Sequence, residues 1–599
     1  MQTRRLPIDV SAASLLPPAV ANLVRPLEPA LLKILFPDKL LRSVPEPESG
    51  ADTAARFAAQ LLQNLNIRYQ ISDADLQRIP ANGSALIVAN HPFGFLEGLL
   101  LLTLLERVRA DYRIVANGLL SSVEALRSRL IFVNPFQENA SAQENGRGLR
   151  ASLEWLQAGG MLVMFPAGEV AHLNWRERAV ADPKWNTAPV RLARRAGCVT
   201  LPLFFEGTNS LRFQMIGTIH PRLRTLNLAR ELINKSKQTI QVRIGSAIAP
   251  GVLRGYADVE AATEYLRART YLLLNRTAEG GTPEFGGKTR ARLIPPVASR
   301  LMAAEAASLP PERTLAATSD FTVYVASAHE IPNVLREIGR CREMTYREIG
   351  EGTGNSFDLD EFDDYYQHIF LWAPKDGRVA GAYRVAATPN VLESRGIKGL
   401  YTSTLFHYDP AFFARIGPAL ELGRSFICRD YQKHYAPLLL LWKGIAEWVR
   451  MRPECAVLFG AVSISSEYQS LSQTLIVNFL NGHLTNEMSD LVRARRGYRR
   501  PAMLPKHLKQ LSRLLPTIEE LSSSIQDLEG DGKGVPVLIR QYLKLGGQFL
   551  GFNVDPHFSN ALDALILADL RTATKPMLER CMGREGAAQF RAFHRIPES

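Results

Sequence analysis

Residues 85–98 read ALIVANHPFGFLEG, and this stretch decides the expected fold. Its five apolar residues Ala85–Ala89 have the composition of a strand buried on both faces, and a Leu-rich helix is expected at about Leu96–Arg109. The alternation continues with strands at Tyr112–Ala116, Met161–Phe165, Thr200–Phe205 and Thr239–Ile244 and helices at Gly148–Ala158 and Val190–Ala196. This pattern predicts an α/β domain with a mostly parallel sheet.

A second α/β unit is expected from Phe321 onward. Its strands are predicted at Phe321–Val325, Ile369–Trp372, Val379–Val385, Leu420–Ile427 and Val457–Val462, with helices at Ile331–Glu348 and Leu438–Arg450. Residues 275–320 are rich in Gly and Pro, with one helix expected near Val297–Ala307, and are assigned to a linker. The 599 residues thus divide into a domain at 1–274 with an N-terminal helical segment, a linker at 275–320 and a domain at 321–599 with a C-terminal extension.

The composition is that of a globular protein. Apolar residues make up 46% and charged residues 22%, which excludes a disordered, collagen-like or coiled-coil chain. The five cysteines show no CxxC spacing, so we expect neither a disulfide framework nor a structural zinc site, and we expect a reducing compartment.

The sequence offers no membrane span but a strongly basic balance. No stretch of about 18 uncharged apolar residues occurs, and no signal-peptide run follows the first residues. Residues 15–44 are rich in Leu and Pro with interspersed Lys and Arg, which fits either an amphipathic helix in a membrane interface or a helical pair packed on the next domain. The net charge of +12 suits nucleic acid, anionic lipid or an acidic carrier protein, and the charge alone does not choose among them.

His91 and Glu97 form the first candidate site. They follow a buried strand and open a helix, which is a usual place for chemistry in an open α/β sheet. A histidine with a nearby carboxylate is a general-base pair, in which the acid orients the ring and stabilises the imidazolium. Because residues 90–98 hold no Ser or Cys, the simplest chemistry is deprotonation of a bound hydroxyl that attacks an activated acyl group. The structural alternative is a histidine that ends the strand and caps the helix.

Two later segments, FPAGEV at 165–170 and LPLFFEGTNS at 201–210, follow the next predicted strands. With the histidine block they resemble, over about residues 60–250, the glycerolipid acyltransferase family, whose members carry a His–acid block, an FPEG-like block and a V-P block in this order. The sequence departs from that pattern in two places. Five residues rather than four separate His91 from Glu97, and Ala167 stands at the FPEG glutamate, with Glu169 two positions later.

Both departures resemble the branch of this family that acylates lyso-lipids without a glycerol-phosphate headgroup. The resemblance implies that His91 is the catalytic base and Glu97 its orienting acid. It further implies that Gly168, Glu169 and Asn209 belong to the site that binds the acceptor.

The second candidate site is a set of charged residues between 342 and 424. Its members are Arg342, Asp360, Asp363, His368, Arg384, Glu421 and Arg424. Three of them lie in apolar strand patterns, where charges are costly to bury unless they pair or do chemistry. Glu421 and Arg424 cannot share one face of a regular strand, and a β-bulge or bend near Gly423 would permit it. A structural network of salt bridges is the alternative.

The segments DEFDDY at 360–365, GAYR at 381–384 and ELGRSF at 421–426 resemble the acyl-homoserine-lactone synthases and their GNAT-like relatives, and most closely the ornithine-lipid N-acyltransferases. With the segment at 534–558, the resemblance covers about residues 320–575. It implies a GNAT-like α/β domain. It also implies catalytic roles for Glu421, as acceptor of the amine proton, and Arg424, with Arg342, Asp360, Asp363 and Arg384 in substrate binding.

The residues after the 420–427 strand bear on the acyl donor. The pyrophosphate loop common in GNAT proteins is replaced by RDYQKH at 429–434, which disfavours free coenzyme A and favours acyl carrier protein. Residues 491–513 contain eight Arg or Lys and no acid, so Arg493–Arg513 fits a landing surface for that acidic carrier. A solvated or membrane-facing strip is the alternative.

Together the two resemblances imply a bifunctional ornithine-lipid synthase. The C-terminal domain would transfer a 3-hydroxyacyl group from acyl carrier protein to an amino acid, with ornithine favoured, and the N-terminal domain would esterify the 3-hydroxyl. Expected partners are acyl carrier protein, the amino acid and the lipid surface on the inner face of a bacterial cytoplasmic membrane, with no nucleic acid, metal or cofactor.

Two alternatives remain open. The first is a lysophospholipid acyltransferase fused to an N-acyltransferase for another amine, such as glycine or a polyamine. Carboxylates near the acceptor, for which Asp360 and Asp363 are the candidates, would favour a dibasic amino acid over glycine. The second is a hemolysin-like membrane-binding protein without enzymatic activity, which would need no ordered polar sites.

Overall fold

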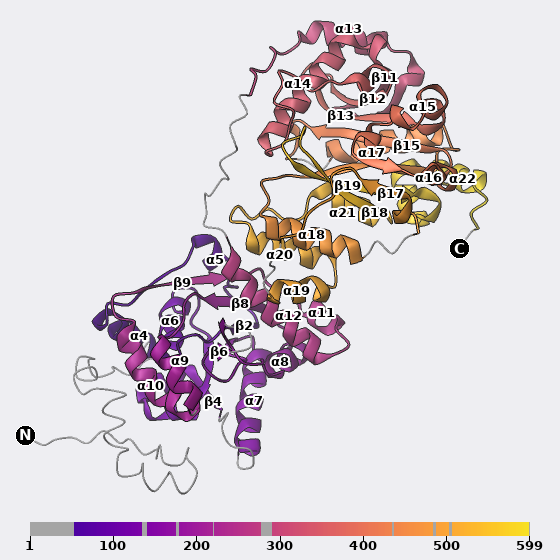
Figure 1. Ribbon diagram of the computed structural model, residues 1–599. Coiled ribbons are helices and arrows are strands. Elements are labelled where there is room, and N and C mark those ends of the chain that lie inside the picture. Colours follow the sequence, from indigo (N-terminus) through magenta and orange to yellow (C-terminus); the bar gives the residue numbers. More distant parts are fainter. Residues whose placement is uncertain are drawn as a thin grey trace, which may run out of the picture. The chain divides into compact units, whose positions relative to one another are not determined.

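The computed structural model describes residues 53–133, 141–174, 179–219, 221–276, 290–433, 436–482, 487–501 and 506–597. These residues form two compact units (Figure 1). The first contains residues 53–276 and 506–532, and the second contains 290–501 and 533–597. The amphipathic segment expected at 15–44 lies outside the described residues.

The first unit is built on a seven-stranded sheet with the order β1-β9-β8-β2-β5-β3-β4. Its strands are β1 Arg68–Gln70, β2 Ala85–Ala89, β3 Tyr112–Asn117, β4 Leu130–Val133, β5 Met161–Met164, β8 Val199–Phe205 and β9 Thr239–Ile244. All neighbours run parallel except β8 and β9. The short strands β6 His172–Asn174 and β7 Ala179–Ala181 pair separately. The expected mostly parallel sheet is thus confirmed.

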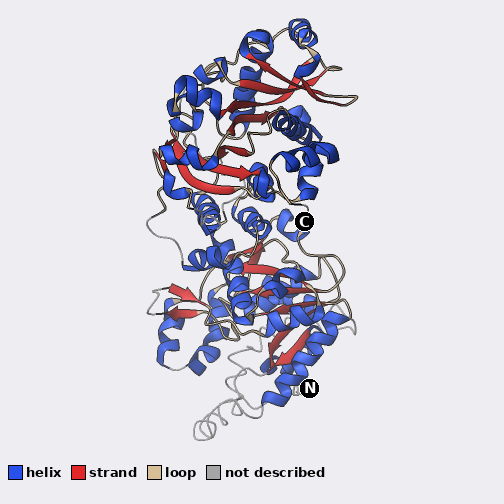
Figure 2. Ribbon diagram, turned by 90° about the vertical axis from the view of Figure 1, so that its right-hand side faces the viewer, coloured by secondary structure: helices blue, strands red, loops and turns tan. Residues whose placement is uncertain are grey.

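Helices cover this sheet, as the blue ribbons of Figure 2 show. They are α4 Thr53–Asn64, α5 Asp73–Gln77, α6 Phe95–Leu105, α7 Ser141–Gln157, α8 Ala188–Ala196, α9 Leu211–Ile219, α10 Pro221–Asn234, α11 Pro250–Gly255, α12 Val259–Leu272, α19 Lys506–Leu514 and α20 Ile518–Leu528. One apolar cluster joins α4 and α6 to the strands, and β2 at its centre is buried along its whole length. Because β2, β5 and β8 are parallel, the segments that follow them meet at one edge of the sheet.

The second unit has an eight-stranded sheet with the order β10-β11-β12-β13-β15-β16-β19-β18. Its strands are β10 Thr314–Ala317, β11 Thr322–Ser327, β12 Gln367–Ala373, β13 Arg378–Ala387, β15 Ala419–Ile427, β16 Val457–Ile464, β18 Gln548–Asp555 and β19 Ala561–Asp569. Only the β15–β16 pair is parallel, and it is hydrogen-bonded over three residues. Strands β14 Phe406–Tyr408 and β17 Val492–Ala494 form a separate pair.

The helices of the second unit cover both faces of its sheet. They are α13 Ser299–Ser308, α14 Pro332–Glu348, α15 Thr388–Arg395, α16 Pro410–Ile416, α17 Ala436–Arg450, α18 Ser470–Gly482, α21 Val537–Lys544 and α22 Lys575–Phe593. Helices α17 and α22 pack on one face through a single apolar cluster. The other face carries two apolar clusters, one toward α14 and one toward α15 and α16. The unit is α/β, as the sequence predicts.

The division differs from the sequence-based boundaries in two places. Residues 506–532, expected in the C-terminal domain, belong to the first unit, where α19 lies beside α12 (Figure 1). The physical reason is a buried ion pair, since Arg269 Nη2 of α12 lies 2.8 Å from Asp527 Oδ2 of α20. Strand β10, expected in the linker, pairs with β11 at the edge of the second sheet.

No helix among the described residues is long and apolar enough to cross a membrane.

Candidate active sites

The His91 site lies at the carboxyl edge of the first sheet, directly after β2. His91 Nδ1 lies 3.3 Å from Glu97 Oε1, and the Glu97 side chain is fully buried. The same oxygen accepts a hydrogen bond of 2.6 Å from the backbone N–H of Phe93, which fixes the carboxylate toward the ring. The expected histidine–carboxylate pair is therefore present in geometry, although five residues separate its members.

A tight turn makes this pairing possible. Gly94 has φ +98°, a conformation that L side chains rarely adopt, and a Cβ there would stand 2.7 Å from Leu228 Cδ2. The turn brings Glu97, on the first turn of α6, back over the residue that ends β2. The sequence pattern predicts a helix start here. The turn at Gly94 explains how Glu97 reaches His91 although five residues separate them.

The charge of Glu97 acts on the histidine. Burial lowers the pKa of His91, but the nearby carboxylates of Glu97 and Asp182 outweigh burial, and the pKa lies above its ordinary value. A base with a raised pKa binds the proton of an attacking hydroxyl more strongly. The arrangement can thus accept a proton at the ring and stabilise the imidazolium that forms.

Asp182 is a residue of this site that sequence reasoning missed. Its Oδ1 accepts a hydrogen bond of 3.1 Å from the backbone N–H of His91, and its Oδ2 accepts one of 2.9 Å from Trp185 Nε1. Tyr271 and Arg267 hold its backbone. Asp182 lies far from His91 in sequence and in no recognisable block, so nothing in the sequence indicated it.

The FPAGEV segment flanks His91. The ring of Phe165 stacks on the imidazole at 4.4 Å between centroids, and Ala171 N–H donates to the His91 carbonyl over 2.8 Å. Gly168 and Glu169 lie in the exposed turn between these two contacts. The turn is therefore beside the histidine, as a substrate-binding role requires.

Asn209 follows β8 and is buried next to the turn that contains Phe93 and Gly94. Its Nδ2 donates to the Phe93 carbonyl over 3.3 Å, while its Oδ1 has no hydrogen-bond partner among the described residues. Three segments from separate strands thus converge on His91, in the order that the sequence predicts.

The second site is a polar row on one face of the eight-stranded sheet. Directly opposed residues in neighbouring strands share a face. His368 lies opposite Arg384, and Arg384 lies opposite Gly423. Farther along the same face, Ser463 lies opposite Asp563. The row separates the two apolar clusters of this face, so its charges are buried and must be paired.

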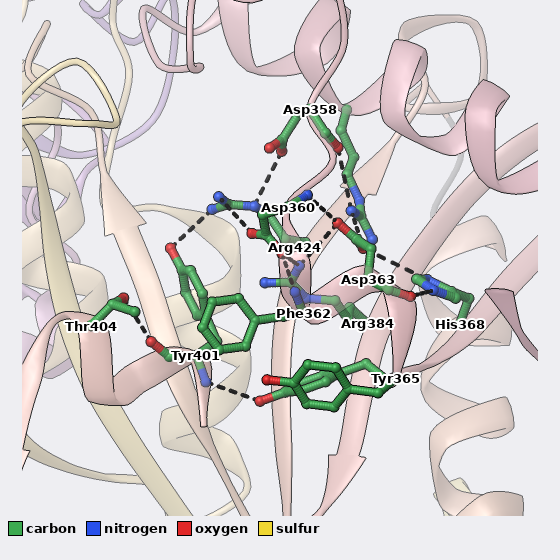
Figure 3. Close-up of polar contacts among 12 residues, drawn as sticks. Asp358, Asp360, Phe362, Asp363, Tyr365, His368, Arg384, Tyr401, Thr404 and Arg424 are labelled. Atoms are coloured by element: carbon green, nitrogen blue, oxygen red, sulfur yellow. Dashed lines mark hydrogen bonds and ion pairs between the residues drawn. The ribbon is translucent and has the colours of Figure 1, made fainter. Parts of the chain in front are cut away.

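Arginines and aspartates alternate in this row (Figure 3). Three contacts carry the network: Arg342 Nη1 to Asp363 Oδ1 at 2.7 Å, Arg384 Nη1 to Asp363 Oδ2 at 3.1 Å, and Arg424 Nε to Asp358 Oδ2 at 3.1 Å. Arg384 also donates to Asp360, and Arg424 Nη2 lies 3.5 Å from Asp360 Oδ2. Burial raises the pKa of Asp363, but Arg342 and Arg384 outweigh it and hold that pKa well below its usual range.

His368 takes part as a neutral ring. Burial, together with the charge of Arg342, lowers its pKa to about 4. Its Nε2 lies 2.9 Å from the Asp363 carbonyl. It therefore carries no charge at neutral pH, and the network balances three arginines against Asp358, Asp360 and Asp363.

The expected irregularity near Gly423 is present. The β13–β15 register shifts between Ala382 and Arg384, so that Arg424 and Ser425 bulge out of the strand. Arg424 has φ +49°, and this conformation turns its side chain into the network.

Glu421 is not brought to Arg424. Its carboxylate accepts hydrogen bonds from Tyr366 Oη, from Tyr401 N at 3.1 Å and from Thr402 N at 2.7 Å, all within the buried interior. Arg424 Nη1 in turn donates to Tyr401 Oη over 3.0 Å. Tyr401 thus connects the two residues, and with Asp358 it is a member of the site that sequence reasoning missed. Neither Tyr401 nor Asp358 lies in the sequence segments on which the family resemblance rests.

Two further features bear on ligands. Among the described residues, no group of three or more His, Cys, Asp or Glu could hold a metal ion. The basic stretch 493–513 does not form one element, because Val492–Ala494 is β17 of the second unit and Lys506–Leu514 is α19 of the first. The landing surface expected there is therefore divided between the units.

Comparisons with known proteins agree with this division into two sites. The family model described as acyltransferase matches residues 56–280, and that of the acetyltransferase (GNAT) domain matches residues 341–442. The chain is 32% identical over 272 residues to glycine Nα-acyltransferase of Bacteroides thetaiotaomicron, a match that covers 42% of this chain and 77% of the relative.

Two other relatives are similar. L-ornithine Nα-acyltransferase of Rhodobacter capsulatus is 28% identical over 255 residues, covering 40% of this chain and 88% of the relative. Lyso-glycine lipid O-acyltransferase of Phocaeicola vulgatus is 27% identical over 203 residues, covering 32% of this chain and 68% of the relative.

Proposed function

The chain belongs to the family of the amino-acid Nα-acyltransferases and carries an acyltransferase domain in addition, and from this premise we propose that it makes an aminolipid by two successive acyl transfers. The second unit N-acylates an amino acid, with ornithine favoured, using a 3-hydroxyacyl group carried by acyl carrier protein. The first unit then esterifies the 3-hydroxyl of this lyso-lipid.

The observation that carries the second step is the His91–Glu97 pair, with Nδ1 and Oε1 3.3 Å apart. Deprotonation of the 3-hydroxyl by His91 lets its oxygen attack the carbonyl carbon of a thioester. The C–O bond forms, the C–S bond breaks, and the imidazolium returns its proton to the leaving thiolate. Glu97 stabilises the imidazolium in between, and Phe165 holds the ring in place.

The first step is supported by the buried polar row of the second unit. In that step the neutral α-amine attacks the thioester carbonyl, the C–N bond forms, the C–S bond breaks, and the proton that the nitrogen loses goes to the leaving thiolate. Arg424 sits at the bulge of β15, and a substrate carboxylate would join Asp358 and Asp360 around its guanidinium. No cofactor is needed beyond the acyl donor.

The fusion has a physical advantage, because the intermediate is a single-chain amphiphile that would partition away from a separate second enzyme. A linked second site raises its effective concentration. Because this amphiphile partitions into lipid, we propose that the chain works peripherally on the inner face of a bacterial cytoplasmic membrane. High salt or alkaline carbonate should then release the chain from the membrane.

Glycine is the second candidate acceptor, and the relative with 32% identity, named a glycine Nα-acyltransferase, favours it. The deciding experiment uses the purified chain with 3-hydroxyacyl-acyl carrier protein and either ornithine or glycine, followed by mass spectrometry. An N-acyl product that gains a second acyl chain supports the proposal. The absence of any N-acyl product with either amino acid would refute it.

A further inference from the structure

Three carboxylates in the second unit take no part in the arginine network. They are Glu351, which follows α14, Asp555 at the end of β18, and Asp563 in the middle of β19. All three are buried, and Asp563 is 6% exposed. They continue the polar row of the sheet on the side of β16, β19 and β18.

Strand register brings these groups to one face. Asp563 lies opposite Ser463 of β16 and opposite Asn553 of β18. Ser463 Oγ donates to Glu351 Oε2 over 2.8 Å, so Glu351 lies over the same face. Asp555 follows two residues after Asn553 on that face, and its Oδ1 accepts from the His557 N–H over 2.8 Å.

The Asp563 carboxylate has an open position. Its Oδ2 is buried and has no hydrogen-bond partner among the described residues. A buried carboxylate oxygen without a donor is costly, and such atoms are completed by a protein donor, an ordered water or a ligand. The ionised carboxylate only accepts hydrogen bonds, so the partner that completes its charged form is a donor.

The local charge calls for a cation. The three arginines of the network are balanced by Asp358, Asp360 and Asp363, and among the described residues no Lys or Arg forms an ion pair with Glu351, Asp555 or Asp563. Burial, together with the charges of Asp555 and Glu351, raises the pKa of Asp563 well above its ordinary value, and the charge of Arg424 offsets this only in part. Burial likewise raises the pKa of Glu351 to about 7. A bound cation would relieve this repulsion.

We infer that Asp563, supported by Glu351 and Asp555, binds the side-chain ammonium of a dibasic amino acid, and so determines the acceptor of the N-acyl transfer proposed above. The α-amine is not the group that fits, because it must be neutral to attack the thioester, and an anionic pocket would keep it protonated. A dibasic amino acid brings one net positive charge, whereas glycine and other neutral amino acids bring none. Asp360 and Asp363, the carboxylates first expected in this role, are already bound to arginines.

The test compares Asp563→Asn with the wild type, using three acceptors: ornithine, norvaline, which has the same carbon chain without the second amine, and glycine. Asp569→Asn is the matched control, since Asp569 ends the same strand and pairs with Arg571 outside the cluster. Glu351→Gln is a second variant in case Asp563→Asn does not fold.

The wild type should acylate ornithine with a KM well below that for norvaline. Asp563→Asn should raise the KM for ornithine about 10- to 100-fold, the size expected for a buried hydrogen bond to a charged group, and leave norvaline and glycine unchanged. Its melting temperature should not fall, because Asp563 Oδ2 has no hydrogen-bond partner among the described residues that the substitution could remove. Glu351→Gln should raise the ornithine KM in the same direction.

Three results would overturn the inference. They are a wild type that prefers glycine or norvaline, a variant that loses all three acceptors equally, and variants that leave the ornithine KM unchanged. In each case the wild type still carries out N-acyl transfer, so the proposed function stands. A wild type that acylates no amino acid at all would instead refute the proposed function.

Discussion

At the scale of single residues, the His91 ring depends on one carboxylate. Glu97 raises the pKa of His91 against the effect of burial, so the free base that O-acylation needs is reached only above that raised pKa. The rate of O-acylation should therefore fall as the pH drops through it.

Glu97→Gln removes the charge and leaves burial, which lowers the pKa of His91. The acid limb of the O-acylation profile should then move to lower pH, while the plateau rate falls roughly 10²-fold because the imidazolium loses its counter-charge. The measurement is the pH dependence of esterification of a supplied lyso-lipid, with the exposed Glu124→Gln as control. An acid limb that stays in place would show that Glu97 does not act on the base.

We expect Glu421 to have a structural role rather than a role beside a base, because three donors within the protein bind its carboxylate. Glu421→Ala would leave Tyr366 Oη and the backbone N–H groups of Tyr401 and Thr402 without an acceptor. We expect a loss of about 3–5 kcal/mol in the free energy of unfolding. Glu393→Ala, at an exposed position on α15, serves as the control in denaturant titration. A variant that unfolds like the wild type yet forms no N-acyl product would return Glu421 to a direct role in catalysis.

At the scale of elements, most strands could be predicted because they are short apolar runs. Ala85–Ala89 is one example, and its five residues are all buried in the sheet.

The β-bulge near Gly423 was foreseen because Glu421 and Arg424 could not otherwise share one face of the strand. The bulge is present, although Glu421 does not bind Arg424. The partners of Arg424 were not foreseen. Its side chain contacts Asp358, in a loop, and Tyr401, at the start of a short 3-10 helix, and no periodicity reveals the course of either segment.

Helix α20 could not be assigned from the sequence, because its place depends on contacts between residues that are 258 to 449 positions apart. Asp527 accepts from Ser246 N at 2.7 Å, from Arg78 Nη1 at 2.9 Å and from Arg269 Nη2 at 2.8 Å. Each partner is polar and far away in sequence, so neither composition nor spacing connects it to α20.

Asp527→Ala should therefore destabilise the first unit, although residue 527 lies between segments of the second. Arg269, whose side chain is fully buried, would lose a partner, at a cost of about 3–5 kcal/mol. In this variant, heating should abolish O-acylation at a lower temperature than N-acylation. The measurement is the residual activity of each kind after heating. The control is Glu519→Ala, at an exposed position of the same helix. Equal heat resistance of both activities in Asp527→Ala would contradict this assignment.

At the scale of the whole molecule, the sequence resemblance to a fused aminolipid synthase is confirmed by the two family matches and by relatives of both kinds. The acyltransferase activity is accordingly established, whereas the carrier protein, the headgroup and the membrane face stay proposals. Sequence blocks identify such a family because they hold its polar residues in order. They do not select the acceptor, because that depends on which carboxylates remain unpaired in the folded unit.

The central claim is that two acyl transfers occur in sequence on one chain. Its most direct test is mass spectrometry of lipids from a bacterium that lacks aminolipids and expresses either the wild type or His91→Ala. The wild type should produce a two-chain aminolipid. His91→Ala should reduce it about 10²–10⁴-fold, the usual effect of losing a general base, and accumulate the single-chain N-acyl amino acid. Undiminished two-chain lipid in the variant, or no aminolipid of either kind with the wild type, would contradict the account.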